Sequence, residues 1–204
     1  MATRLSVAPP NLPIAPNQYE RRYQEQLNNV QRLFYNSVAN SINLPNPYGS
    51  FYSVSTLTNP IANVVHVVPF DSPLDGAYNT KIGAVNSRVY VSETGMYNVQ
   101  FSAQANVAAG GATGIINIWL RRNGEDFPAS TGRVVVNGVS AETIASWNYL
   151  ISLQTNDYIE LAWSSSETHL VLQAEPATAT IPSVPSVILT IYKVSALNNS
   201  VGQS

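Results

Sequence analysis

Residues able to bind a metal ion or transfer protons are sparse in this chain of 204 residues. It contains two histidines, His66 and His169, and no cysteine. A structural zinc site needs four ligands close together, mostly Cys and His, and the histidines lie far apart inside strand-like segments. This pattern predicts packed or sheet-edge histidines, so we expect no metal site and no cofactor.

Nucleophilic and carboxylate catalysis also lack a clear pattern. Serines are abundant, but none lies in the G-x-S-x-G context of a strand-to-helix turn. Paired carboxylates can hydrolyse glycosides, yet most acidic residues here lie in turn contexts: Asp71, Asp75, Glu93, Glu125, Asp126, Glu142, Asp157, Glu160, Glu167 and Glu175. We therefore expect a protein that is not an enzyme and has no catalytic residue. A carbohydrate-active enzyme is kept as the third alternative.

One oxygen-rich stretch resembles a loose calcium loop. The sequence FDSPLDG places Asp71 and Asp75 close together. It lacks the regular ligand spacing and the terminal bidentate Glu of a calcium loop, and Asp-led turn chemistry explains it equally well. A weak Ca²⁺ site near Asp71 and Asp75 stays open.

The three tryptophans are candidates for contacts with sugars or with other subunits. Trp147 and Trp163 share their strand faces with aliphatic residues, which predicts core positions. Trp119 alternates with Ile118 and Leu120 and shares its face with polar neighbours. Trp119 is therefore the candidate for an intersubunit or ligand contact.

Composition excludes several classes of partner. Charged residues make up 11% of the chain, the net charge is −2, and Lys81 and Lys193 are the only lysines. Nucleic-acid binding through phosphates requires a basic stripe, and none is present. A membrane span requires about 18 consecutive apolar residues, and the sequence contains no such run.

The opening MATRLSVAPPNLPIAP has no continuous apolar segment, so we expect no secretory signal.

A proline-rich segment begins the chain. Because proline fixes φ and favours extended geometry in the residue before it, residues 1–17 are expected to form an extended anchor peptide suited to lying in a partner's groove. The predicted partner-binding residues are Pro9, Pro10, Leu12, Pro13, Ile14, Pro16, Tyr19 and Tyr23.

An amphipathic helix is predicted after this peptide. Asn17 with Glu20 is a variant of the capping box, and apolar residues then recur at helical spacing from about Gln18 to Ile42. The seam of this helix consists of Leu27, Val30, Phe34 and Val38. Pro45 and Pro47 end the pattern. The seam can pack on its own β domain, on symmetry mates or on another protein.

Period-2 alternation follows the prolines. In YNVQFSAQAN, Tyr97, Val99 and Phe101 begin one apolar face, with polar residues between them, as in a strand with one buried side. Similar strands are expected near 50–56, 62–68, 82–91, 132–137, 145–153, 158–163, 168–174 and 186–194, with a hairpin at Asn123–Gly124. About nine short strands predict an all-β antiparallel sandwich.

These patterns divide the chain into four parts. We expect an anchor peptide at 1–17, a helix or stalk at 18–45, a β head at 46–194 and a flexible tail at 195–204.

Four segments of the head resemble the C1q/TNF-like jelly-roll family. They are GAVNSRVYVSETGMYNVQFSAQ (83–104), NIWLRRNG (117–124), ETIASWNYLISLQTNDYIELAWSS (142–165) and SVILTIYKV (186–194). The family pattern Gly-Asp-x-(Val/Ile)-x-Leu is met at 156–161, with Asn156 in place of the glycine. The resemblance covers about 50–194 and implies a jelly-roll head that forms a homotrimer. None of the family's calcium or receptor residues is carried over.

The neutral surface and the N-terminal tail are similar to virion proteins of tailed phages. In particular, the segment LPIAPNQYERRYQEQLNNVQRLFYNSV (12–38) resembles N-terminal segments of small structural proteins of marine and cyanobacterial phages. This resemblance implies a virion location. The leading hypothesis is a non-enzymatic, homotrimeric virion protein, attached through residues 1–42 to a phage capsid or tail protein and displaying its head as a decoration or fibre. The alternative is a tail adhesin that binds a host surface glycan.

Overall fold

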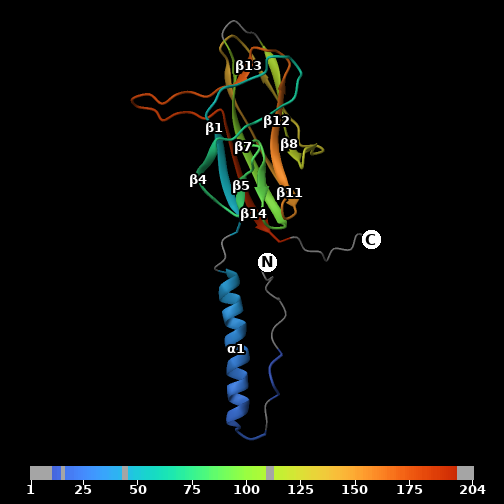
Figure 1. Ribbon diagram of the computed structural model, residues 1–204, viewed down its shortest axis with the longest axis vertical. Coiled ribbons are helices and arrows are strands. Elements are labelled where there is room, and N and C mark those ends of the chain that lie inside the picture. Colours follow the sequence, from blue (N-terminus) through green and yellow to red (C-terminus); the bar gives the residue numbers. More distant parts are fainter. Residues whose placement is uncertain (1–10, 15–16, 43–45, 109–112, 197–204) are drawn as a thin grey trace. The chain divides into compact units, whose positions relative to one another are not determined.

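The computed structural model describes residues 11–14, 17–42, 46–108 and 113–196, except the side chains of 39–42 and 72–75. The chain divides into two compact units, Met1–Pro45 and Asn46–Ser204. The described residues contain one helix and fourteen strands (Figure 1).

The first unit is built around α1 (Arg21–Ile42). The sequence predicts a start at Gln18, but the backbone carbonyl of Glu20 accepts the hydrogen bond from the amide of Gln24 at 3.2 Å. Glu20 therefore precedes the first helical residue, and Asn17 lies outside the helix. Polar pairs one turn apart support the exposed face, including Arg21–Glu25 at 2.8 Å, each worth about 0.2–0.5 kcal/mol.

The second unit is a sandwich of two antiparallel sheets. In the first sheet, called sheet A, β11 (Glu142–Leu153) and β14 (Val187–Ser195) flank the long β7 (Gly95–Val107). Its other strands are β1 (Tyr48–Ser53), β2 (Leu57–Thr58), β4 (Ser72–Tyr78) and β13 (Leu170–Leu172). Because β1 pairs with β14, the first and last strands of this unit are neighbours.

The second sheet, called sheet B, is ordered β10-β8-β12-β6-β5, with β3 paired to β12 and β9 paired to β8. Its strands are β3 (His66–Val67), β5 (Thr80–Ile82), β6 (Val89–Val91), β8 (Gly114–Arg122), β9 (Glu125–Asp126), β10 (Gly132–Val136) and β12 (Tyr158–Ser165). The chain crosses repeatedly between the sheets after β7, as in a jelly roll. The predicted all-β antiparallel jelly-roll sandwich is confirmed.

The core lies between the sheets. Alternate residues of β7, from Tyr97 to Val107, are at most 2% exposed. Ile159, Leu161 and Trp163 of β12 cover them from sheet B and are equally buried. The predicted inward faces of these strands are therefore confirmed, as is the core position of Trp163.

Trp147 connects the sheets at their edge. It is half-buried, and its ring centroid lies 5.5 Å from that of Phe101. A Cβ atom added at Gly132 of β10 would lie 2.4 Å from the indole. The ring therefore lies directly on the backbone of sheet B, which only glycine permits at this position.

The sequence misplaces several strand boundaries. The predicted strand at 82–91 is two strands, β5 and β6, joined by residues 83–88. FDSPLDG is predicted as a turn or calcium loop, but Ser72 begins β4, which pairs with β1 at the edge of sheet A. Proline is tolerated in an edge strand because its nitrogen need not donate there.

The hairpin signal is correct. Asn123 and Gly124 both have positive φ, 54° and 88°, as a type I′ turn requires. They connect β8 to β9, with Arg121 opposite Asp126.

We predict that the core of β14 determines the stability of the head. Ile191 is 0% exposed, whereas Ile181, between β13 and β14, is 59% exposed. Ile191→Ala should lower the free energy of unfolding by about 2–5 kcal/mol, because it leaves a cavity. Ile181→Ala, the matched control, should change it by at most about 0.5 kcal/mol. Urea denaturation measures both, and equal losses would contradict the assignment of the core.

Candidate functional site

The apolar stripe of α1 is the first candidate interaction surface. Its members Tyr23, Leu27, Val30, Phe34 and Val38 are all half-buried. No described residue of the helix belongs to the hydrophobic core. The stripe therefore lacks the complete burial that a 22-residue amphipathic helix normally needs for stability.

The segment before the helix offers further apolar groups. The hydroxyl of Tyr23 donates to the carbonyl of Pro13 at 3.2 Å, which holds this part of the peptide beside the helix. Leu12, Ile14 and Tyr19 are exposed. The other predicted anchor residues, Pro9, Pro10 and Pro16, lie outside the described residues. Partner binding by this segment stays a prediction.

Trp119 lies on β8 and is only 8% exposed. Its indole nitrogen donates to Oδ1 of Asp126 at 2.8 Å, and Arg121 Nε lies 3.2 Å from the same oxygen. The hairpin of β8 and β9 thus covers most of the ring. A shallow depression beside it is lined by Asn117, Asp126, Phe127, Arg133 and Ser164, among others. A trimer or ligand contact at Trp119 stays a prediction.

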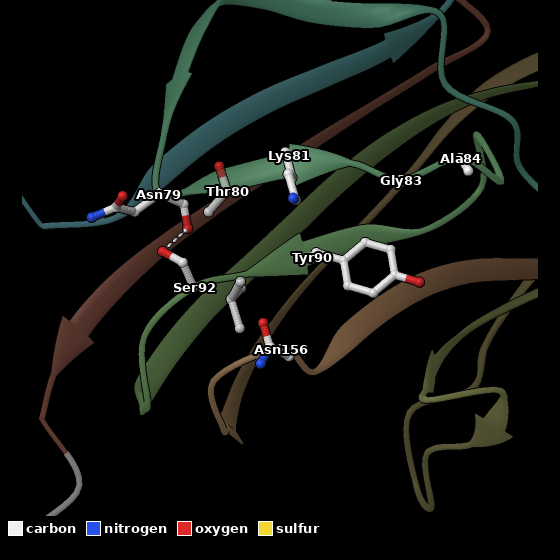
Figure 2. A pocket seen from close by; sticks show the side chains of 9 residues that line it. Asn79, Thr80, Lys81, Gly83, Ala84, Tyr90, Ser92 and Asn156 are labelled. Carbon is white, nitrogen blue, oxygen red and sulfur yellow. Dashed lines mark hydrogen bonds between the residues drawn. The ribbon is translucent and has the colours of Figure 1, made fainter. Parts of the chain in front are cut away.

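A recess on the β5–β6 hairpin is the second candidate surface, with a cavity volume of about 550 Å³. It is lined by Asn79, Thr80, Lys81, Gly83, Ala84, Tyr90, Val91, Ser92 and Asn156. Figure 2 shows residues from three chain segments meeting here, with Lys81 pointing from β5 toward the side of Tyr90 and Asn156. We call it the Lys81 recess.

Backbone constraints hold the walls of the Lys81 recess. Lys81 lies opposite Tyr90 in the β5–β6 pairing. A Cβ atom at Gly83 would lie 2.4 Å from the ring of Tyr90, so this glycine lets the ring lie against the chain. The hydroxyl of Ser92 donates to the carbonyl of Asn79 at 3.0 Å (Figure 2).

The turn between β11 and β12 supplies Asn156, whose φ is +72°. Asn is among the few non-glycine residues that tolerate this left-handed geometry. The backbone amide of Asn156 donates to the carbonyl of Val91 at 2.9 Å, and Asp157 Oδ2 accepts from the amide of Gln154 at 2.8 Å. The turn is therefore docked on β6, with Asn156 at the recess.

Sequence reasoning missed the Lys81 recess. Two signals were available: Asn156 stands where the resembled family has glycine, and Lys81 is one of two lysines. Neither signal shows that the two residues line one recess, because that arrangement depends on the pairing of β5, β6 and β12.

The residues considered for catalysis and metal binding are dispersed. No cluster of three or more His, Cys, Asp or Glu side chains occurs among the described residues. His66 Nε2 and the side-chain amide of Asn59 hydrogen-bond at 3.0 Å, and Asp71 Oδ2 accepts from the amide of Val54 at 2.7 Å. The side chain of Asp75 lies outside the described residues, so the calcium hypothesis stays untested.

Glu160 is the one charged residue in the buried part of the described structure. Ser87 Oγ donates to its Oε1 at 3.0 Å, and Arg88 and Arg121 lie within 4 Å of its carboxylate. These partners tie sheet B together around a paired charge, the condition under which a buried carboxylate is tolerated.

No known protein family and no curated protein matches the sequence. Among solved structures, the chain is similar to murine APRIL at pH 5.0, with 15% identity and a TM-score of 0.47. The match covers 73% of this chain and 99% of that chain. At this level of similarity, the fold assignment rests on the strand order itself.

No helix in the described part of the chain is long and apolar enough to cross a bilayer.

We predict that Tyr149 makes the head less stable at high pH. Its hydroxyl donates to the carbonyl of Ser130 at 2.6 Å, and burial raises the pKa of Tyr149 to about 12. The ordinary tyrosine pKa is about 10, so between pH 10 and 12 the unfolded chain loses this proton while the folded chain keeps it. Stability is therefore complete below pH 10 and falls as pH rises toward 12.

Urea midpoints measured between pH 8 and 12 test this expectation. Tyr149→Phe should flatten the decline, while Tyr19→Phe, which alters an exposed tyrosine before the helix, should leave it unchanged. A decline that is equally steep in Tyr149→Phe would contradict the assignment.

Proposed function

We propose that the protein is a non-enzymatic, homotrimeric structural protein of a phage particle. Residues 1–42 attach it to a capsid or tail protein, and the β head is displayed as a decoration or fibre. The observation that carries this proposal is the incompletely buried apolar stripe of α1 beside exposed apolar residues of the preceding peptide.

The geometry of α1 supports association. Tyr23, Leu27, Val30 and Phe34 follow one another at spacings of 4, 3 and 4 residues, which fits the seam of a short coiled coil. An isolated helix of this length is marginal in water. Packing against two symmetry mates, or against a particle protein, supplies the missing burial.

The outer face of sheet A supports a trimer of heads. Ile144 and Leu150 of β11 are each 62% exposed, and Tyr192 of β14 is 44% exposed. Uncharged groups such as Gln100 of β7 and Asn148 of β11 lie between them, and the carboxylate of Glu142, at the end of the same face, accepts a hydrogen bond from Asn106. A surface of apolar groups among neutral amides can be buried without stripping water from charges.

In a trimer, even a weak contact by each N-terminal segment is sufficient to hold the protein on the particle. Each trimer presents three copies of residues 1–42, and binding of the first raises the effective concentration of the others. The virion location is supported by the neutral surface and by the similarity of the N-terminal segment to phage structural proteins.

A receptor-binding adhesin of the phage tail is the second candidate. The observation that favours it is the Lys81 recess, whose volume lies within the range of small-ligand sites. In this function the head binds a host surface glycan, and residues 1–42 serve only as the attachment.

We predict that deleting residues 1–42 abolishes incorporation into particles while leaving a folded trimer. The head contains the buried core on its own, so the shortened chain should unfold at the same urea concentration. Incorporation is measured by supplying either form to a phage that lacks its own copy and imaging the particles by cryo-EM. Full occupancy by the shortened chain would refute the anchor.

A second prediction concerns the stripe itself. Val30→Asp should reduce the helical circular dichroism signal at 222 nm and lower particle occupancy, because it places a charge where α1 packs. Asn29→Asp adds the same charge at the neighbouring exposed position and is the matched control. Equal helicity and occupancy in the two variants would show that the stripe has no partner.

A further inference from the structure

The Lys81 recess contains two polar groups without partners. The ammonium of Lys81 and the side-chain amide of Asn156 have neither a hydrogen bond nor an ion pair to any described residue. Other polar groups nearby are already engaged: Thr80 donates to the carbonyl of Tyr48 at 2.6 Å, and Ser92 to that of Asn79. Lys81 and Asn156 are thus free to bind a ligand.

The charge of the recess selects an acidic ligand. None of the described residues that line it is Asp or Glu. The nearby Glu93 is bound by Lys193 at 2.8 Å and by Asn79 at 3.0 Å, and Asp157 accepts hydrogen bonds within its own turn and from Asn123. Lys81 therefore has no internal carboxylate to neutralise it.

The size and walls of the recess select a sugar rather than a small anion. A volume of about 550 Å³ is typical of sites for whole organic ligands. Tyr90 contributes an aromatic ring, and Asn156 contributes both an amide donor and an acceptor, which suits vicinal hydroxyl groups. A single ammonium matches one carboxylate, whereas phosphate is commonly held by arginine forks or several donors.

We propose that the Lys81 recess binds a carboxylate-bearing saccharide, with Lys81 pairing with the carboxylate, Asn156 hydrogen-bonding the hydroxyls and Tyr90 contacting the ring. The inference deepens the adhesin function and does not depend on how residues 1–42 attach. It also accounts for Asn156, which stands where the resembled family pattern has glycine. Glycine would satisfy the left-handed turn at 156, but only a side chain there reaches the recess.

The test uses the full-length protein and a panel of acidic saccharides: oligogalacturonate, a glucuronate oligosaccharide and sialyllactose. Methyl-esterified oligogalacturonate is the neutral counterpart of the first. Ligand-observed NMR and titration calorimetry should detect at least one acidic saccharide and no methyl ester, with an affinity that weakens as salt is added.

Three variants locate the site. Lys81→Met keeps the length of the side chain and should weaken binding about tenfold or more, since it removes a charge-assisted hydrogen bond. Asn156→Gly keeps the left-handed turn and should weaken binding about three- to tenfold. Arg122→Met removes an exposed cation of β8 that does not line the recess, and it should leave binding unchanged.

The outcomes distinguish the recess assignment from the adhesin function. Binding of none of the panel, or acidic binding that Lys81→Met leaves intact, would overturn the recess assignment. If the protein still captured host cells or neutral glycans in that case, the adhesin function would stand without the recess. Loss of both cell capture and glycan binding would remove the adhesin function as well.

Discussion

The head depends on one row of side chains that crosses four neighbouring strands. Trp147 of β11 lies opposite Phe101 of β7, Phe101 opposite Leu189 of β14, and Leu189 opposite Phe51 of β1. Three of the four are at most 2% exposed, and burying each contributes about 1.5–3 kcal/mol. Since the row joins residues 51, 101, 147 and 189, it fixes the register of sheet A and brings the first and last strands together. Packing of Trp147 on Gly132 then fixes the second sheet against the first.

Within the two sheets, turn residues with left-handed backbone geometry determine which side chains point out of the turns. Asn123 and Asn156 both have positive φ, and both sit in turns at one end of sheet B. Asn123 is used internally: its side chain donates to Asp157 at 2.8 Å and accepts from the amide of Tyr158 at 3.0 Å. Asn156 satisfies the same backbone requirement with its side chain unengaged. The two residues show how one conformational demand yields either a structural or a binding group.

The parts of the fold that follow from local pattern were predictable, and those that follow from long-range pairing were not. The alternation in β7 and β12 identifies the buried faces because burial selects every second residue. Asn123–Gly124 identifies its hairpin because few residues adopt a type I′ turn. By contrast, β4 is a strand only because β1 offers it a partner, which no feature of FDSPLDG reveals. The Lys81 recess could not be predicted from the sequence for the same reason, since its walls come from segments that meet only through sheet B.

The pairing of β1 with β14 has one more consequence. Tyr48, where the chain enters the head, lies opposite Tyr192 near its exit, and both lie near the Met96 end of β7. The connection 137–141 lies at the other end, where the amide of Val107 donates to the carbonyl of Ala141. Adjacent entry and exit points favour circular permutation. A chain joined across these points and reopened at 137–141 would keep every strand pairing, and its new ends would lie at the opposite end of the head.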